Sequence, residues 1–320
     1  MRRFLKTWID PFVLALLAVL ALGILVPVPE AAREAVETAG TVAVTILFLV
    51  YGMRLSTREV LAGLRNVRLQ GAILAATYLL FPAIGLALHG LTGSLIGGSL
   101  ATGLLYLTLL PSTVQSSVAF TSIARGNVPG ALCAATISNV LGMVLTPLLV
   151  LAFLGQVGPA GFQGLRDVLL HLLLPFVVGQ LLQPLTGSWI RNHRSVTVSV
   201  DRGTILIVVL GAVLEATADG VWSAVSWQML LALVALCGLV LGALLAATWW
   251  GGRGLGLDVS DRIALLMCGS KKSLATGLPM AAVLFPASTA AVVAVPVIVF
   301  HQIQLIVCAV LARHLARRVH

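Results

Sequence analysis

Charged residues are scarce in this chain of 320 residues: Asp, Glu, Lys and Arg make up 10% of it, whereas 59% of the residues are hydrophobic. Soluble domains carry about 25% charged residues, so this composition excludes a soluble globular protein. The mean hydropathy is +1.06, and runs of about 20 mostly apolar residues, each long enough to cross a bilayer, recur along the chain. The sequence therefore predicts a polytopic membrane protein with no room for a soluble domain.

Cysteine is also rare. The four cysteines fall in apolar runs without the CxxC or other spacing of metal ligands, so neither a disulfide framework nor a zinc site is expected. The chain contains no GxxxxGK[ST] nucleotide loop, no HExxH motif and no matched Ser, His and carboxylate. These absences argue against an enzyme and against a pump with its own ATP-driven motor.

Acidic residues number 11 against 20 Lys and Arg, which gives a net charge of +9. The basic residues are scattered over short loops without interleaved aromatics, so nucleic acid is not an expected partner. Instead they indicate topology and contact with anionic membrane lipids. With ten spans both termini share one side, and most basic residues fall on it, which places both termini in the cytoplasm and the protein in the cell (inner) membrane.

Ten hydrophobic segments are expected once Pro, Gly and charge clusters are used as boundaries. They cover residues 11–28, 37–53, 69–90, 96–124, 130–154, 166–186, 203–218, 226–249, 262–285 and 288–312. The first follows MRRFLK as a signal peptide would, but it is long and lacks a small-residue cleavage site, so we expect a retained helix. The fold class is thus all-α, with ten transmembrane helices in one membrane unit spanning residues 1–320.

The ten segments divide into two repeats of five, residues 8–155 and 164–314. Because five is odd, the repeats are inverted in the membrane. Their fourth segments contain LPSTVQSSVAF and LMCGSKKSLAT, which pair without a gap so that Ser117 matches Ser273. Pro111 and Gly269 both weaken a helix, so we expect helices 4 and 9 to be broken and to cross. Paired interrupted helices in inverted repeats point to a transporter binding site.

Two adjacent lysines, Lys271 and Lys272, lie in the middle of the otherwise uncharged stretch 263–285. A charge at the centre of a spanning helix costs roughly 2.5–3.5 kcal/mol on insertion scales, and such residues usually mark a substrate or ion pathway. The lysines therefore indicate the functional centre.

The segments LPSTVQSSVAFTSIARGN and CGSKKSLATGLPMA resemble the bile acid:sodium symporter family, and specifically its bacterial symporter-like branch. The resemblance covers essentially the whole chain. It implies a panel domain from residues 8–55 and 164–220 and a core domain from residues 66–155 and 224–314, with helices 4 and 9 unwound where they cross. It also implies transport by alternating access.

In the sodium-dependent members, the resemblance implies sodium ligands from a Ser-Asn pair, from hydroxyls of the fifth segment, from a Glu and from a Gln. Here Ser116 and Ser117 stand for the pair, Met267 for the Glu and Lys271 for the Gln, and Thr77 stands for a further Gln of the third segment. Hard cations prefer oxygen ligands, and a nearby ammonium repels them. We therefore expect the ammonium of Lys271 or Lys272 to take the place of sodium.

The same charges have two other uses. They can hold an anionic solute, helped by helix N-termini. Because burial disfavours the charged form of an ammonium, one lysine can also lose its proton and couple transport to H+. The coupling ion thus remains Na+ or H+, and no resident cofactor or metal is expected.

Candidate solute- or ion-binding residues share a polar side chain at the depth of the crossing. They are Thr113, Gln115, Ser116, Ser117, Asn139, Ser270, Lys271, Lys272, Ser273, His301 and Gln302. Gln304 lies at the same depth of the last segment as His301 and Gln302. An alternative for the hydroxyls and amides among these residues is that they form hydrogen bonds between helices and bind no ligand. Glu215, the carboxylate within a span, is read as an interfacial residue near Asp219 rather than as the partner of a lysine.

These features predict a secondary active transporter of a small organic, anionic solute. An alternative is an inorganic cation/proton exchanger or channel of related architecture, but such antiporters place an essential Asp beside the crossing and no Asp occurs in a span here. A third class, a membrane sensor or regulatory subunit, predicts no flux. The oligomeric state stays open.

Overall fold

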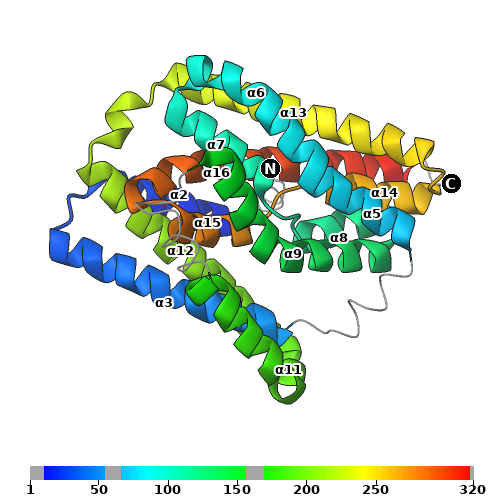
Figure 1. Cartoon of the computed structure of the whole chain (residues 1–320), viewed down its shortest axis with the longest axis horizontal. Helices are drawn as coiled ribbons and strands as arrows, with labels where there is room; N and C mark the ends of the chain where they lie inside the picture. The colour runs from blue at the N-terminus through cyan, green and yellow to red at the C-terminus, as the bar shows by residue number, and fades with distance from the viewer. Residues whose placement is uncertain (1–10, 55–65, 156–168, 318–320) are drawn as a thin grey trace, which may run out of the picture. The chain divides into compact units, whose positions relative to one another are not determined.

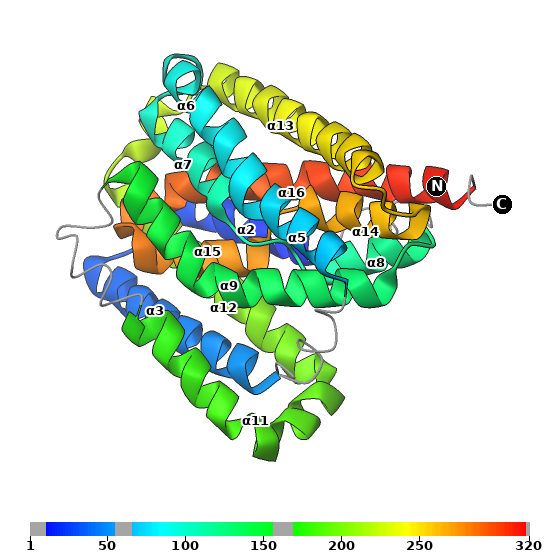
Figure 2. The same cartoon turned by 45° about the vertical axis from the view of Figure 1, so that its right-hand side comes forward.

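The computed structural model describes residues 11–54, 66–155 and 169–317, and all regular elements in these ranges are helices (Figures 1 and 2). Seven of these helices are long and apolar enough to cross a membrane, by length and composition alone. They are Glu30–Arg54, Val67–Ile96, Val128–Leu154, Leu170–Asn192, Ser195–Ala218, Trp227–Gly254 and Ala287–Ala316. Leu14–Leu25 and Gly98–Leu109 are shorter apolar helices.

The elements follow one another without a strand in the described ranges. In chain order they are α2 (Pro11–Leu25), α3 (Glu30–Arg54), α5 (Val67–Ala75), η1 (Ala76–Leu80), α6 (Phe81–Ile96), α7 (Gly98–Leu109), α8 (Gln115–Ile123), α9 (Val128–Leu154), η2 (Leu169–Leu173), α11 (Leu174–Asn192), α12 (Arg194–Ala218), η3 (Val221–Ala224), α13 (Trp227–Gly254), α14 (Val259–Gly269), α15 (Leu274–Leu284) and α16 (Ala287–Ala316). η1 and η2 are π-helical turns, and η3 is a 3-10 turn.

The chain divides into two compact units. Unit 1 comprises Met1–Leu55, Gly158–Val225 and Leu278–Val292, and unit 2 comprises Ser56–Val157, Ser226–Gly277 and Val293–His320. Two of the boundaries between the units, at 277/278 and 292/293, fall within α15 and α16.

In unit 1, α3 packs against α11 and α12, and α2 packs against α12 (Figures 1 and 2). The backbones of α3 and α11 approach closely at two glycines. A Cβ added to Gly52 would lie 2.1 Å from the carbonyl oxygen of Phe176, and one added to Gly179 would lie 2.1 Å from that of Leu49. Small residues of this kind let membrane helices pack on one another.

In unit 2, α14 is surrounded by α5, α8, α9 and α13, while α6 packs on α7 and α13. A core cluster that includes Leu69, Ile73, Ala131, Ala134 and Cys268 joins α5, α9 and α14, and its residues are at most 2% exposed. Helix α14 is therefore buried within the protein, and it leads directly into the segment that carries Lys271 and Lys272.

Several helices begin earlier than hydropathy predicted. The segments expected at 37–53 and 203–218 correspond to α3 from Glu30 and α12 from Arg194. The additional turns of α3, EAAREAV, are rich in the helix formers Ala and Glu, and those of α12, RSVTVSVDR, are polar. Helix length follows backbone hydrogen bonding, whereas a hydropathy window detects only the apolar part of a helix. These boundaries were wrong for that reason.

Both expected breaks are present. Helix α7 ends at Leu109 and α8 begins at Gln115, and α14 ends at Gly269 while α15 begins at Leu274. Pro111 lies in the first break, where it cannot donate a backbone hydrogen bond. Both of these segments of unit 2 are thus interrupted by non-helical backbone.

The ungapped pairing of the two motifs does not match these breaks. It pairs Gln115 with Lys271, whereas the helices after the breaks begin at Gln115 and Leu274. Because a proline interrupts the first segment and a glycine the second, the two helices end at different points relative to the paired serines.

Candidate functional site

The two breaks are joined directly by hydrogen bonds. The backbone N–H of Ser273 donates to the carbonyl of Pro111 at 2.9 Å, and the hydroxyl of Ser112 donates to the carbonyl of Cys268 at 2.6 Å. Non-helical backbone is tolerated at membrane depth where its polar groups find partners within the protein. The two segments therefore satisfy part of each other's hydrogen-bonding capacity.

The ammonium of Lys272 lies between main-chain carbonyls. Its Nζ donates to the carbonyl oxygens of Thr77 at 2.9 Å and Leu110 at 2.5 Å. It also lies 4.1 Å from the centre of the Phe81 ring and 5.9 Å from that of the Tyr78 ring. With the residue 1% exposed, the charge is stabilised by carbonyl dipoles and aromatic faces rather than by water.

The local backbone explains why these two carbonyls are available. At the π-turn η1, the N–H of Phe81 bonds to the carbonyl of Ala76, five residues earlier. In the same register the next donor, at Pro82, would bond to Thr77, but proline has no N–H. Leu110 has an extended backbone (ψ 156°) at the end of α7, so its carbonyl leaves the helical ladder.

Gln304 holds the main chain of Lys272. Its Oε1 accepts the N–H of Lys272 at 2.9 Å, and its Nε2 donates to the carbonyl of Lys272 at 2.9 Å. These backbone partners fix the orientation of the amide. The Nε2 of Gln304 is also 2.9 Å from Nδ1 of His301. Because the glutamine nitrogen is a donor, Nδ1 of His301 is assigned as the acceptor, which places the ring proton on the Nε2 of His301.

Lys271 has a different environment. Its Nζ donates to the carbonyl of Ser116 at 3.1 Å and lies 4.2 Å from the centre of the Phe120 ring, and the residue is 0% exposed. An ammonium has three donors. Within the described ranges, the Ser116 carbonyl is the one acceptor bonded to this group, so the buried charge is less fully satisfied than that of Lys272.

Helix α9 forms hydrogen bonds to the backbone of the first break. The amide of Asn139 donates to the carbonyl of Ser112 at 2.6 Å and accepts from the hydroxyl of Thr276 at 2.9 Å. The hydroxyl of Ser138 accepts the N–H of Ser112 at 3.0 Å, and its carbonyl accepts from the hydroxyl of Tyr78. These contacts tie both breaks to one continuous helix.

Several candidate residues from the sequence form hydrogen bonds where the two breaks meet, and others do not. Ser117 donates to the carbonyl of Met267 at 3.0 Å, whereas Ser116 reaches Lys271 through its carbonyl and has its hydroxyl 3.5 Å from that of Thr113. Ser270 donates to Leu266 of its own helix, and Ser273 accepts from Thr276.

Gln115 and Gln302 form no hydrogen bond to either break among the described residues. Gln115 is exposed. The Nε2 of Gln302 is buried and has no hydrogen-bond partner among the described residues, so the amide of α16 that binds the break is Gln304 rather than Gln302.

The sequence interpretation missed three polar residues that form hydrogen bonds at the breaks: Tyr78, Ser112 and Thr276. Gln304, which the sequence places at the depth of His301 and Gln302, bonds to the main chain of Lys272 in the second break. Pro82 was a signal for the third segment, because its missing N–H frees the Thr77 carbonyl.

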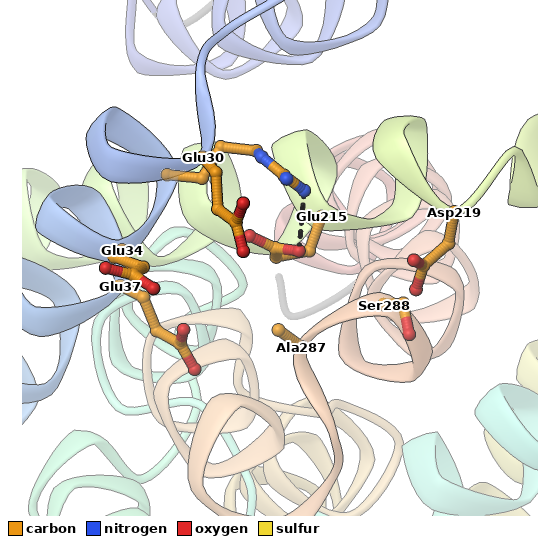
Figure 3. A pocket seen from close by; sticks show the side chains of 8 residues that line it. Glu30, Glu34, Glu37, Glu215, Asp219, Ala287 and Ser288 are labelled. Carbon is orange, nitrogen blue, oxygen red and sulfur yellow. Dashed lines mark hydrogen bonds and ion pairs between the residues drawn. The ribbon is translucent and has the colours of Figure 1, made fainter.

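Glu215 lies in unit 1 and pairs with an arginine. Its Oε2 is 2.9 Å from Nη1 of Arg33, and the two side chains are 25% and 19% exposed. The pair borders a cavity of about 310 Å³ (Figure 3). The cavity is lined by Glu30, Arg33, Glu34, Glu37, Glu215, Asp219, Ala287 and Ser288. Within the part of the chain that the structure describes, His, Cys, Asp and Glu form no group of three or more suited to a metal.

A family model described as the SBF-like CPA transporter family (DUF4137) matches residues 10–317. The chain belongs to this family. Two similar relatives are "Uncharacterized protein PA2026" of Pseudomonas aeruginosa, 42% identical over 97% of this chain and 93% of the relative, and "Putative symporter YfeH" of Escherichia coli (strain K12), 39% identical over 97% and 94%. "Sodium/bile acid cotransporter 7" of Mus musculus is 26% identical over 86% of this chain and 82% of the relative.

Membership of the SBF-like CPA transporter family agrees with the resemblance to bile acid:sodium symporters seen in the sequence. Together with the apolar helices, it makes the chain a multi-pass membrane transporter that acts on a small solute. The matched residues include both breaks and both buried lysines.

Proposed function

We propose that this SBF-like transporter is a secondary active transporter that moves an organic anion across the cell membrane by alternating access. We assign ten membrane spans in two inverted repeats. They are the seven long helices, α2, and the interrupted pairs α7–α8 and α14–α15. The core, residues 66–155 and 224–314, would move against the panel, residues 8–55 and 164–220, with both termini in the cytoplasm.

The observation that carries the proposal is the position of Lys271 and Lys272, which are 0% and 1% exposed at the meeting point of two broken helices. Charges at membrane depth are costly and mark substrate or ion pathways. Half-helix ends and freed carbonyls are the groups that transporters use to bind solute and ions. Family membership supports the same class.

An anionic solute follows from the charge of the site. Among the described residues neither lysine has a carboxylate partner, so the two ammonium groups leave net positive charge at the crossing. Lys271, with one carbonyl bonded, has donors left for an acceptor on the solute. We assign Lys271 as the residue that contacts the anionic group.

We expect this chain to differ in its coupling ion from a relative whose name includes sodium and bile acid. Met267 and Lys271 stand where the family resemblance expects a carboxylate and an amide, and an ammonium at a cation site opposes sodium binding. We therefore propose transport that does not require sodium at this position, with proton coupling as the alternative. The absence of a carboxylate at the crossing, within the described ranges, disfavours a cation/proton exchanger.

Purified protein in liposomes tests the function. Candidate solutes are first found by thermal-shift screening of organic anions, taurocholate included, with sodium, potassium or neither, because a ligand that binds the folded state stabilises it. We expect uptake of a hit without sodium, loss of uptake in Lys271→Gln and retention in Lys271→Arg.

Each part of the proposal has its own contrary result. Uptake that strictly requires sodium would contradict the role of the lysines. Uptake that ignores an imposed pH gradient would remove proton coupling. Absence of flux for every stabilising anion would favour a sensor or regulatory subunit.

A further inference from the structure

The groups around the Lys272 ammonium have the composition of a monovalent-cation site. Two main-chain carbonyl oxygens, from Thr77 and Leu110, contact the charge at 2.9 and 2.5 Å, and the rings of Phe81 and Tyr78 lie on it at 4.1 and 5.9 Å. Carbonyl oxygens replace the hydration shell of monovalent cations in membrane proteins. Divalent cations prefer carboxylate ligands. Among the described residues, no carboxylate bonds to the Lys272 ammonium.

The carbonyls come from two segments whose backbone is independently interrupted. The Thr77 carbonyl is freed by the π-turn and Pro82, and the Leu110 carbonyl by the end of α7 before Pro111. Without the ammonium, both oxygens would remain buried acceptors, a costly state in a protein interior. The pair thus requires a positive charge or another donor.

The ammonium reaches the carbonyls from a fixed attachment point. Gln304 bonds to both the N–H and the carbonyl of Lys272, each at 2.9 Å, so the main chain from which the side chain extends is held at its base. The residue is 1% exposed. Lys272 is therefore secured at its backbone and at its charged end.

We infer that the Thr77 and Leu110 carbonyls form a monovalent-cation site that the protein fills with its own Lys272 ammonium. The inference rests on the proposed function only in placing this site at the centre of a transporter. Lys272 is then a built-in cation, distinct from Lys271, which contacts the solute. Shortening the Lys272 side chain should open the site to free Na+, K+ or methylammonium.

The test measures the thermal midpoint of the purified full chain in detergent, so it needs neither a known solute nor flux. Lys272→Ala is compared with Lys271→Ala, a matched removal of the adjacent, equally buried ammonium. Each is titrated with the chlorides of sodium, potassium and methylammonium, with N-methylglucamine chloride holding the ionic strength constant. Lys272→Ser serves as a second variant, because its hydroxyl adds an oxygen ligand.

We expect Lys272→Ala to melt lower than the unsubstituted protein and to regain at least about 3 °C, saturably, with one of the small cations but not with N-methylglucamine. The unsubstituted protein and Lys271→Ala should show no cation-specific shift. Midpoints of Lys272→Ala and Lys272→Ser that do not depend on the cation would overturn the inference, as would an equal response of Lys271→Ala. Failure of both Lys272 variants to fold with any of the cations would also overturn it.

The result is separable from the transport experiment. A cation response in the absence of any flux would leave the cation site standing and contradict the proposed function. Flux without any cation response would support the proposed function and contradict the cation site.

Discussion

The side-chain amide of Gln304 pairs with both backbone groups of Lys272, accepting its N–H and donating to its carbonyl at 2.9 Å each. A residue on α16 thereby replaces the hydrogen bonds that the main chain loses in the break between α14 and α15. Because each bond involves a fully buried group, removing the amide leaves a donor and an acceptor unsatisfied.

Gln304→Ala should therefore lower the free energy of unfolding by about 2–3 kcal/mol, from two lost hydrogen bonds and the desolvated groups left behind. The thermal midpoint in detergent measures the loss. Gln302→Ala on the same helix is the control, because its Nε2 has no partner among the described residues, and its effect should stay below about 1 kcal/mol. Equal effects would contradict the assigned role of Gln304.

Pro82→Ala should weaken the hold on Lys272 without unfolding the protein. The substitution supplies an N–H that can bond to the Thr77 carbonyl in the register of the π-turn, so it competes with the ammonium for that acceptor. Loss of a hydrogen bond to a charged group corresponds to roughly tenfold or more in function. Uptake into liposomes should fall by about that factor, while the thermal midpoint stays the same or rises.

Pro147→Ala is the matched control for Pro82→Ala. Pro147 also lies inside a helix, α9, and the carbonyls bonded by the two lysines belong to Thr77, Leu110 and Ser116 rather than to that helix. A similar loss of uptake in both variants would mean that helix shape, not competition for Thr77, is responsible.

Asp261 should be a major stabilising residue of unit 2. Its two carboxylate oxygens accept from the amides of Asn66 and Asn127 at 2.6 Å each, and the same asparagines cap α5 and α9. Asp261→Ala removes two charge-assisted bonds and should cost about 3 kcal/mol. Asp258→Ala, which removes only the cap of α14, should cost about 1 kcal/mol.

Denaturation of both variants under the same conditions distinguishes these values. If Asp261→Ala cost no more than Asp258→Ala, the convergence of the capped helix starts on this carboxylate would not contribute to stability.

The two adjacent serines of α8 should respond differently to alanine. Ser117 donates its hydroxyl to the carbonyl of Met267 at 3.0 Å, so Ser117→Ala should cost about 1 kcal/mol or more and loosen the crossing. Ser116 reaches Lys271 through its carbonyl, which alanine retains. Ser116→Ala should therefore leave stability unchanged within about 0.5 kcal/mol, as a denaturation midpoint would show. A larger loss in Ser116→Ala than in Ser117→Ala would contradict these contacts.

The sequence by itself determined the class of the protein. Its scarcity of charge and its apolar runs require a membrane environment, since no other solvent accommodates so much hydrophobic surface. Pro111 and Gly269 sufficed to predict two broken helices, because backbone chemistry at a proline or glycine acts locally. The lysine pair predicted where the functional site lies, because the cost of a charge at membrane depth depends on its position in the apolar run.

Only the tertiary structure decided which partner each charge has. Lys272 bonds to Thr77, 195 positions away, and to Gln304, 32 positions away, and no periodicity in a sequence encodes such distances. It also decided that Ser116 acts through its carbonyl and that Gln304, not Gln302, binds the break. Main-chain carbonyls are present at every residue, so their availability depends on where the helices open and pack, which is set by the fold.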